Sequence, residues 1–245
     1  MRYAMGVEYD GTNYYGFQSQ DNPQLETIQQ KLEQAISSVA DHKISLIPAG
    51  RTDAGVHATN QVIHFDTEAV REDHAWLMGV NTNLPKDISV KWIKRVADDF
   101  HARYFAKYRK YQYFIFNSPV RSALWHQKAT VIYTPLDENK MHEAAQAFIG
   151  EHDFTSFRSA QCQSKTAMRN IHHIKIERMG LFVLVEIQAN AFLHHMVRNI
   201  VGVLLEIGSG KKEINWAKEV LAKKDRKYAG ITAPPDGLYL VEVGY

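Results

Sequence analysis

Hydrophobic residues recur at spacings of three and four from Ile28 to Val39, a pattern that predicts an amphipathic helix packed on a sheet. Thr27 followed by Gln30 fits a capping box at the start of this helix. A second helix is expected within residues 71–84. Short runs of strand-forming residues predict strands at 2–9, 43–47, 61–65 and 88–96. This order resembles a split β-α-β unit, which is an antiparallel sheet with helices on one face.

The rest of the chain repeats this arrangement less clearly. Strands are predicted at 111–116, 171–176, 182–187 and 238–243, the middle two as a hairpin. Helices are predicted at 136–149, 196–207 and 214–221, with Gly150 as the C-terminal cap of the first. We therefore predict an α+β fold of two similar ferredoxin-like halves with antiparallel sheets and helices on one side. The N-terminal subdomain is residues 1–104 and the C-terminal subdomain is residues 105–245.

Two glycines frame a short polar run between the predicted strands that end at residue 47 and begin at residue 61. Gly50 and Gly55 permit the backbone angles of a tight loop, which would carry Arg51, Thr52 and Asp53. Asp53 can be a turn former that hydrogen-bonds its own backbone. Alternatively, Arg51 holds the Asp53 carboxylate ionised, and an ionised carboxylate on such a loop can act as a nucleophile or base.

Charge and aromatic residues are unevenly distributed along the chain, although the net charge is only +2. Residues 1–99 carry 9 basic and 14 acidic side chains, whereas residues 100–245 carry 20 and 13. Residues 100–135 contain no acidic side chain and interleave six basic residues with many aromatic ones. Such a stretch suits a polyanion with stackable bases, or it is a pair of aromatic strands with a basic outer face. The basic segment 211–227 is either an RNA-contacting flank or a solvated helix.

Several sequence blocks resemble one family, in the family's order and over nearly the whole chain. Residues 50–58 read Gly-Arg-Thr-Asp-Ala-Gly-Val-His-Ala, which is similar to the signature loop of the TruA family of tRNA pseudouridine synthases. Further matching blocks are Val-Glu-Tyr-Asp-Gly-Thr at 7–12, Tyr-Gly-Phe-Gln at 15–18, Phe-His-Ala-Arg at 100–103, Lys-Tyr-Gln-Tyr at 110–113, His-Asp-Phe-Thr-Ser-Phe at 152–157 and Phe-Leu-His-His-Met-Val-Arg-Asn-Ile-Val-Gly at 192–202. The resemblance implies that the two sheets join into one extended sheet with a catalytic cleft between the halves.

The resemblance also implies a reaction and its catalytic residues. The expected activity is conversion of uridine to pseudouridine in the tRNA anticodon stem-loop, at positions 38 to 40 in tRNA numbering, with the base flipped into the cleft. Asp53 is the implied nucleophile and Tyr111 the implied partner of the target base, although strand spacing alone leaves Tyr113 an equal candidate. Arg198 lies in an apolar predicted helix, where a charge needs a partner, and the family pattern suggests the Asp53 carboxylate. A surface-facing Arg198, or a partner elsewhere in the core, is the alternative.

Further residues are expected to bind the substrate. Arg51 would touch phosphate or help to expel the base from its stack. The full set of expected substrate-binding residues is Arg51, His57, Arg103, Arg109, Lys110, Tyr111 and Arg158.

Other classes of protein fit the sequence less well. There is no His-Glu-x-x-His motif, no cysteine pair and no glycine-rich phosphate loop, so we expect neither a metal nor a cofactor. No apolar run approaches the length of a membrane span, and the single cysteine, Cys162, favours a reducing compartment such as the cytoplasm. The expected partner is tRNA, bound by a homodimer. The alternatives are a non-catalytic structured-RNA-binding protein and a glycosidic hydrolase, which would need a second carboxylate beside Asp53.

Overall fold

The structure, a computed structural model, describes residues 1–20, 22 and 24–245. The chain divides into two compact units, Met1–Lys107 with Tyr239–Tyr245, and Tyr108–Leu238. The sequence predicts subdomains of residues 1–104 and 105–245, with the last strand in the second. In the structure this strand pairs with a strand of the first unit, with Tyr239 opposite His57. A local sequence pattern predicts a strand but does not reveal so distant a partner.

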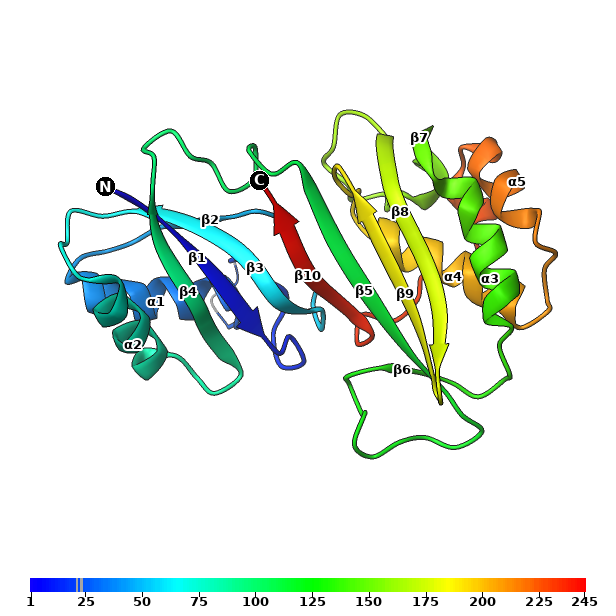
Figure 1. The fold of residues 1–245 in the computed structure, drawn as a ribbon, viewed down its shortest axis with the longest axis horizontal. Coiled ribbons are helices and arrows are strands. Elements are labelled where there is room, and N and C mark those ends of the chain that lie inside the picture. Colours follow the sequence, from blue (N-terminus) through cyan, green and yellow to red (C-terminus); the bar gives the residue numbers. More distant parts are fainter. Residues whose placement is uncertain (21, 23) are drawn as a thin grey trace. The chain divides into compact units, whose positions relative to one another are not determined.

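The first unit is an antiparallel sheet with two helices and one added parallel strand (Figure 1). The strand order is β4-β1-β3-β10, and β2 pairs with β3. Both β4 and β3 run antiparallel to β1, whereas β10 is parallel to β3. The elements are β1 (Arg2–Tyr9), α1 (Ile28–Ala40), β2 (Leu46–Pro48), β3 (His57–Asp66), α2 (Asp73–Asn83), β4 (Ile88–Val96) and β10 (Leu238–Gly244).

Helix α1 confirms the predicted pattern and its predicted cap. The Thr27 side chain accepts a hydrogen bond from the Gln30 backbone N–H, and the Gln30 side chain accepts one from the Thr27 backbone N–H. The apolar face is buried at Ile28, Leu32, Ala35, Ile36 and Ala40. The predicted strand 43–47 is shorter in the structure and begins at Leu46, and side chains of α1 bind backbone groups at and before its start. Ser37 accepts from the Ile44 N–H and Glu33 from the Leu46 N–H.

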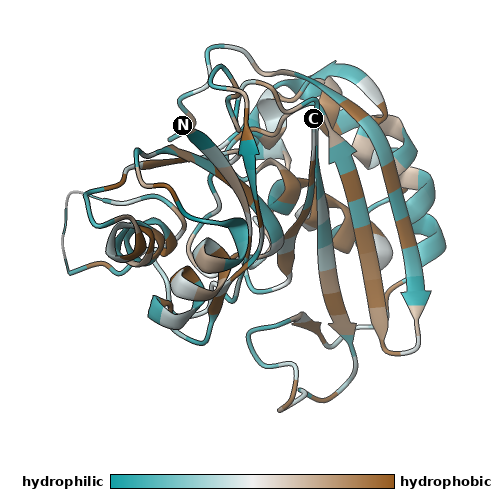
Figure 2. Ribbon diagram, turned by 60° about the vertical axis from the view of Figure 1, so that its left-hand side comes forward, coloured by the Kyte–Doolittle hydropathy of each residue, from teal (hydrophilic) through white to brown (hydrophobic). Residues whose placement is uncertain are grey.

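The second unit is an antiparallel sheet with three helices, in the strand order β5-β9-β8-β7, and β6 pairs with β5 in parallel. Hydrophilic and hydrophobic residues alternate in bands along its strands (Figure 2), in agreement with the alternating burial of β5 and β9. The elements are β5 (Tyr108–Asn117), β6 (Thr130–Ile132), α3 (Glu138–Ala145), β7 (Gly150–Asp153), β8 (Met168–Met179), β9 (Phe182–Ala189), α4 (Met196–Gly208) and α5 (Trp216–Lys223).

The predicted helix 136–149 was too long. α3 ends at Ala145 and is followed by a 3-10 turn, Gln146–Phe148. Gly150, with φ +99°, opens β7 opposite Ile171 instead of capping the helix. The other predicted strands and helices of this unit are present, with boundaries shifted by a few residues.

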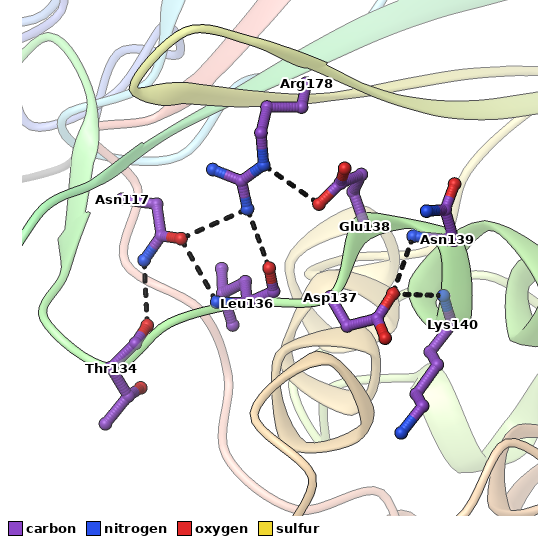
Figure 3. Close-up of polar contacts among 8 residues, drawn as sticks. All are labelled: Asn117, Thr134, Leu136, Asp137, Glu138, Asn139, Lys140 and Arg178. Atoms are coloured by element: carbon purple, nitrogen blue, oxygen red, sulfur yellow. Dashed lines mark hydrogen bonds and ion pairs between the residues drawn. The ribbon is translucent and has the colours of Figure 1, made fainter.

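A polar network fixes the entry into α3 (Figure 3). Arg178 on β8 donates to the Glu138 carboxylate at 2.9 Å and to the Leu136 carbonyl at 2.7 Å. Asp137 caps the helix by accepting from the N–H groups of the two residues at its first turn, Asn139 and Lys140. The network therefore ties the helix start to the sheet with charge-assisted hydrogen bonds. In the described part of the chain, every helix falls short of the length and apolar character that a bilayer crossing requires.

Candidate active site

Asp53 lies on the loop between β2 and β3, as the sequence predicted. The Ala49 N–H donates to the Val62 carbonyl at 2.7 Å, and the Gln61 side chain donates to the Gly50 carbonyl at 2.6 Å. Within the loop, the Val56 N–H donates to the Asp53 carbonyl at 3.2 Å. The loop is therefore anchored to β3 and closed on itself at Asp53.

A second segment, residues 14–17, braces the Asp53 loop from outside. The Phe17 N–H donates to the Thr52 carbonyl at 3.1 Å, and the Gly55 N–H approaches the Tyr14 carbonyl at 3.4 Å. Gly16 has φ +92°, and a Cβ at this position would lie 2.9 Å from the Thr52 carbonyl oxygen. Only glycine allows this approach of one backbone to another.

The Thr52 side chain is also fixed. Its Oγ1 is 2.7 Å from the hydroxyl of Tyr9, in a buried hydrogen bond. Thr52 is thus held through both its side chain and its carbonyl, and its neighbour Asp53 remains half-buried while Arg51 is exposed. The sequence blocks containing Tyr9 and Gly16 contributed to the family resemblance, but their structural role as supports of Asp53 was not predicted.

His57, an expected substrate-binding residue, has the surroundings of a core side chain. It is 1% exposed, and its ring stacks on Tyr239 with centroids 4.6 Å apart. Its Nδ1 lies 3.1 Å from both the Gly11 nitrogen and an Asp10 carboxylate oxygen. These contacts link the start of β3 to β10 and to the segment after β1; a contact with substrate stays a prediction.

Tyr111 and Tyr113 of β5, which strand spacing alone could not distinguish, have different surroundings in the structure. Tyr113 is fully buried, and its hydroxyl lies 2.6 Å from Thr130 Oγ1 and donates to the Pro234 carbonyl at 2.8 Å. Burial raises the pKa of the Tyr113 hydroxyl above its ordinary value. Tyr111 is 8% exposed and meets the Phe192 ring edge-on, with centroids 5.1 Å apart. Tyr113 is therefore engaged in the core, and the contact of Tyr111 with a base stays a prediction.

Arg198 occupies the first turn of α4, which follows His195 in a left-handed conformation with φ +64°. Its Nε donates to the Ala233 carbonyl at 2.8 Å, and the Ala233 N–H donates back to the Arg198 carbonyl at 3.1 Å. The side chain is half-buried. The expectation that this arginine has a partner is met by the Ala233 carbonyl; the carboxylate partner implied by the resemblance stays a prediction.

Residues beside Arg198 hold the turn of α4 and were not predicted. Asn199 is fully buried and donates to the Phe157 carbonyl at 2.8 Å. Its side-chain oxygen accepts from Arg226 at 3.0 Å and from Thr232 at 2.7 Å. Arg226 and Thr232 lie far along the chain, so no local pattern could have joined them to this helix.

The remaining predicted RNA-binding residues differ in exposure. Arg109 is 9% exposed and donates to the Asn190 carbonyl at 3.0 Å, so this contact ties β5 to the end of β9. Arg158 donates to the carbonyls of Cys162 and Ser164, which organises its own loop. Lys110 is half-buried and Arg103 is exposed. Their contacts with substrate stay predictions.

Comparison with known proteins identifies the family. A family model described as "tRNA pseudouridine synthase" matches residues 5–105 and 144–245. The tRNA pseudouridine synthase A of Colwellia psychrerythraea is 55% identical over 245 residues, covering all of this chain and 94% of the relative. The enzyme of the same name from Histophilus somni strain 2336 is 56% identical, covering all of this chain and 90% of the relative.

Among solved structures, a chain of "Crystal Structure of a Cbf5-Nop10-Gar1 Complex" is 13% identical, with a TM-score of 0.32 over 82% of this chain and 54% of that chain. This likeness is too weak to bear on function. The sequence relatives and the family model instead confirm the resemblance seen in the motifs. The chain belongs to the family of tRNA pseudouridine synthases.

Proposed function

We propose that this chain isomerises uridine to pseudouridine in the anticodon stem-loop of tRNA, at positions 38 to 40 in tRNA numbering, with Asp53 as the nucleophile. The reaction breaks the glycosidic carbon–nitrogen bond, turns the base and rejoins it through carbon. It needs no net redox change and no hydrolysis. A carboxylate that attacks and later leaves meets this requirement.

The observation that carries the proposal is the fixed position of the Asp53 loop. Hydrogen bonds hold the residue on its N-terminal side, Thr52, through both the side chain and the carbonyl. A catalytic group held by the surrounding protein loses little entropy when the substrate binds, because its geometry already exists. A turn-forming aspartate would not need this bracing from a distant segment.

The other residues take supporting roles in the proposal. Arg51 is exposed on the same loop, where it can contact phosphate or occupy the space that a flipped base leaves. Extruding a base costs a few kcal/mol, which such a planar cation offsets in part. Tyr111 stacks on the target uracil, and Arg198 pairs with the Asp53 carboxylate, as the resemblance implies.

The proposal is tested by incubating a tRNA transcript with the purified chain, without added metal, and mapping pseudouridine in the anticodon arm. Asp53→Asn should abolish the product and leave the Kd for tRNA nearly unchanged, because the two side chains have similar size. Asp41→Asn is the matched control, since Asp41 is exposed and asparagine tolerates its left-handed backbone with φ +60°. Normal product formation by Asp53→Asn would exclude the nucleophilic role.

The same transcript, labelled in uracil, separates the alternatives. A synthase rearranges the labelled nucleoside, a glycosidic hydrolase releases free uracil, and a binding protein leaves the RNA unchanged. We further expect a cytoplasmic homodimer, because one protomer can then grip a long tRNA while the other modifies it. Light scattering with and without tRNA measures the oligomeric state.

A further inference from the structure

The turn that follows β4, residues 100–105, presents an aromatic side chain to solvent on a rigid support. Tyr104 is 74% exposed, the highest value of any aromatic residue in the described part of the chain. Its ring lies against His101 in a tilted arrangement, with centroids 4.2 Å apart and an interplanar angle of 32°. The Arg103 guanidinium lies 5.9 Å from the Tyr104 ring centroid. The turn thus places an accessible aromatic surface beside a positive charge.

Hydrogen bonds fix the backbone of this turn. His101 Nδ1 accepts from the N–H groups of Arg103 and Tyr104 at 3.2 and 3.3 Å, and the His101 carbonyl accepts from Phe105. These bonds fold the turn around the His101 side chain and so fix the backbone from which the Tyr104 ring projects.

Three further contacts tie the turn to the rest of the first unit. The Ala102 N–H donates to His64 Nδ1 at 3.2 Å, and the Ala102 carbonyl accepts from the Tyr245 hydroxyl at 2.8 Å. Arg2 donates to the Phe100 carbonyl at 2.8 Å. Loop tips with exposed residues are normally mobile, so this degree of anchoring indicates that the position of Tyr104 matters.

The turn lies at the opposite end of β3 from the Asp53 loop. His57 follows the Asp53 loop directly, whereas His64, which holds the turn, is near the other end of the strand. At about 3.3 Å per residue, the stretch from His57 to His64 spans roughly 20 Å. In Figure 1 the segment after β4 accordingly lies at the end of β1 where the chain begins.

We propose that Tyr104 is a stacking site for an unpaired base of the tRNA, outside the anticodon arm, with Arg103 beside it for the adjoining phosphate. This inference rests on the proposed function for the identity of the RNA. An exposed aromatic ring accepts any base through its flat face, and a neighbouring arginine supplies the charge that RNA requires. Arg103 is the one formally charged side chain among residues 100–105, so the turn itself favours an anionic partner.

The test compares Tyr104→Ala with Tyr104→Phe, which keeps the ring. Tyr104→Ala should raise the Kd for full-length tRNA roughly 5- to 150-fold, the range expected for one lost base–aromatic stack, with kcat unchanged. Tyr104→Phe should bind like the wild type. Neither variant should change the Kd for an isolated anticodon stem-loop, because that RNA lacks the unpaired bases outside the anticodon arm that the proposed site would hold. Circular dichroism and thermal melting establish that both variants are folded.

A direct measurement uses tRNAs in which the fluorescent base 2-aminopurine replaces one unpaired base at a time. Its fluorescence should be quenched at one position by the wild type and by Tyr104→Phe, and not by Tyr104→Ala. Equal Kd values for all three proteins, or an equal loss with the isolated stem-loop, would overturn the proposal. Dissociation of a dimer by Tyr104→Ala would assign the surface to a second copy of the chain instead. Binding is measured separately from turnover, so the result does not depend on Asp53.

Discussion

Replacing Gly16 with alanine should shift the Asp53 loop and slow the reaction. An alanine there meets two difficulties. The backbone at φ +92° disfavours any residue with a Cβ, at about 1–2 kcal/mol. The added Cβ would also lie 2.9 Å from the Thr52 carbonyl oxygen and 3.3 Å from the Asp53 carbonyl carbon. Relieving these contacts requires a movement of about 0.5 Å, which falls on the backbone that carries Asp53.

Gly210→Ala is the matched control for this change. Gly210 also has a positive φ, +75°, but a Cβ there would find no atom within 4 Å. The two variants therefore share the backbone strain, and only Gly16→Ala adds the steric contact. Overpacking of this kind typically costs about 1–3 kcal/mol, so the free energy of unfolding should fall by that much more in Gly16→Ala than in Gly210→Ala.

The assays are urea unfolding and steady-state pseudouridine formation. Gly16→Ala should lower kcat about 10- to 100-fold, because small displacements of a catalytic group have effects of this order, and the KM for tRNA should change little. Gly210→Ala should retain wild-type kcat. If the two variants had the same stability and the same kcat, the bracing of Asp53 by residues 14–17 would not matter for catalysis.

Two further predictions concern side chains with defined environments. Tyr113→Phe should lower the free energy of unfolding by about 1–2 kcal/mol through lost hydrogen bonds and leave kcat nearly unchanged. Tyr111→Phe should instead lower kcat and leave the free energy of unfolding nearly unchanged. A loss of kcat confined to Tyr113→Phe would reverse the assignment. Burial, followed by the charge of Arg2, lowers the pKa of His64 from 6.5 to about 4. As the pH falls, His64 is protonated in the unfolded chain before it is protonated in the folded protein. Its contribution to the free energy of unfolding is therefore fully present above pH 6.5 and falls by up to about 3 kcal/mol as the pH drops towards 4. His64→Asn, which keeps an acceptor for the Ala102 N–H, should show a smaller loss between pH 7 and pH 4.5 in urea unfolding; an unchanged loss would contradict this reasoning.

Local patterns in the sequence predicted most of the elements. The spacing of Ile28, Leu32 and Ile36 predicted α1, and Thr27 with Gln30 predicted its cap, because both signals arise from residues close together in the chain. The two glycines around Asp53 predicted its loop for the same reason. One error, at the start of β2, occurs where a group distant in the chain binds the backbone, because Ser37 of α1 accepts from the Ile44 N–H ahead of the strand.

The site could be predicted only in part. Sequence motifs indicated Asp53, Tyr111 and Arg198, but the strand period of two places Tyr111 and Tyr113 on the same face. Only the structure shows that Thr130 and Pro234 engage the hydroxyl of Tyr113. Likewise, the bond between Tyr9 and Thr52 joins residues from different strands and loops, and neither residue signals the other.

The strand β10 comes after the whole second unit in the chain, yet it pairs with β3 and covers His57 with Tyr239. During synthesis, the first unit therefore cannot close its sheet until the ribosome has also made every residue of the second. The part of the β3 edge that β10 covers, at His57 and Ala58, stays open for most of translation, and its pairing must wait for a contact of very long sequence separation, which slows folding. An N-terminal fragment released early would expose that edge to other chains.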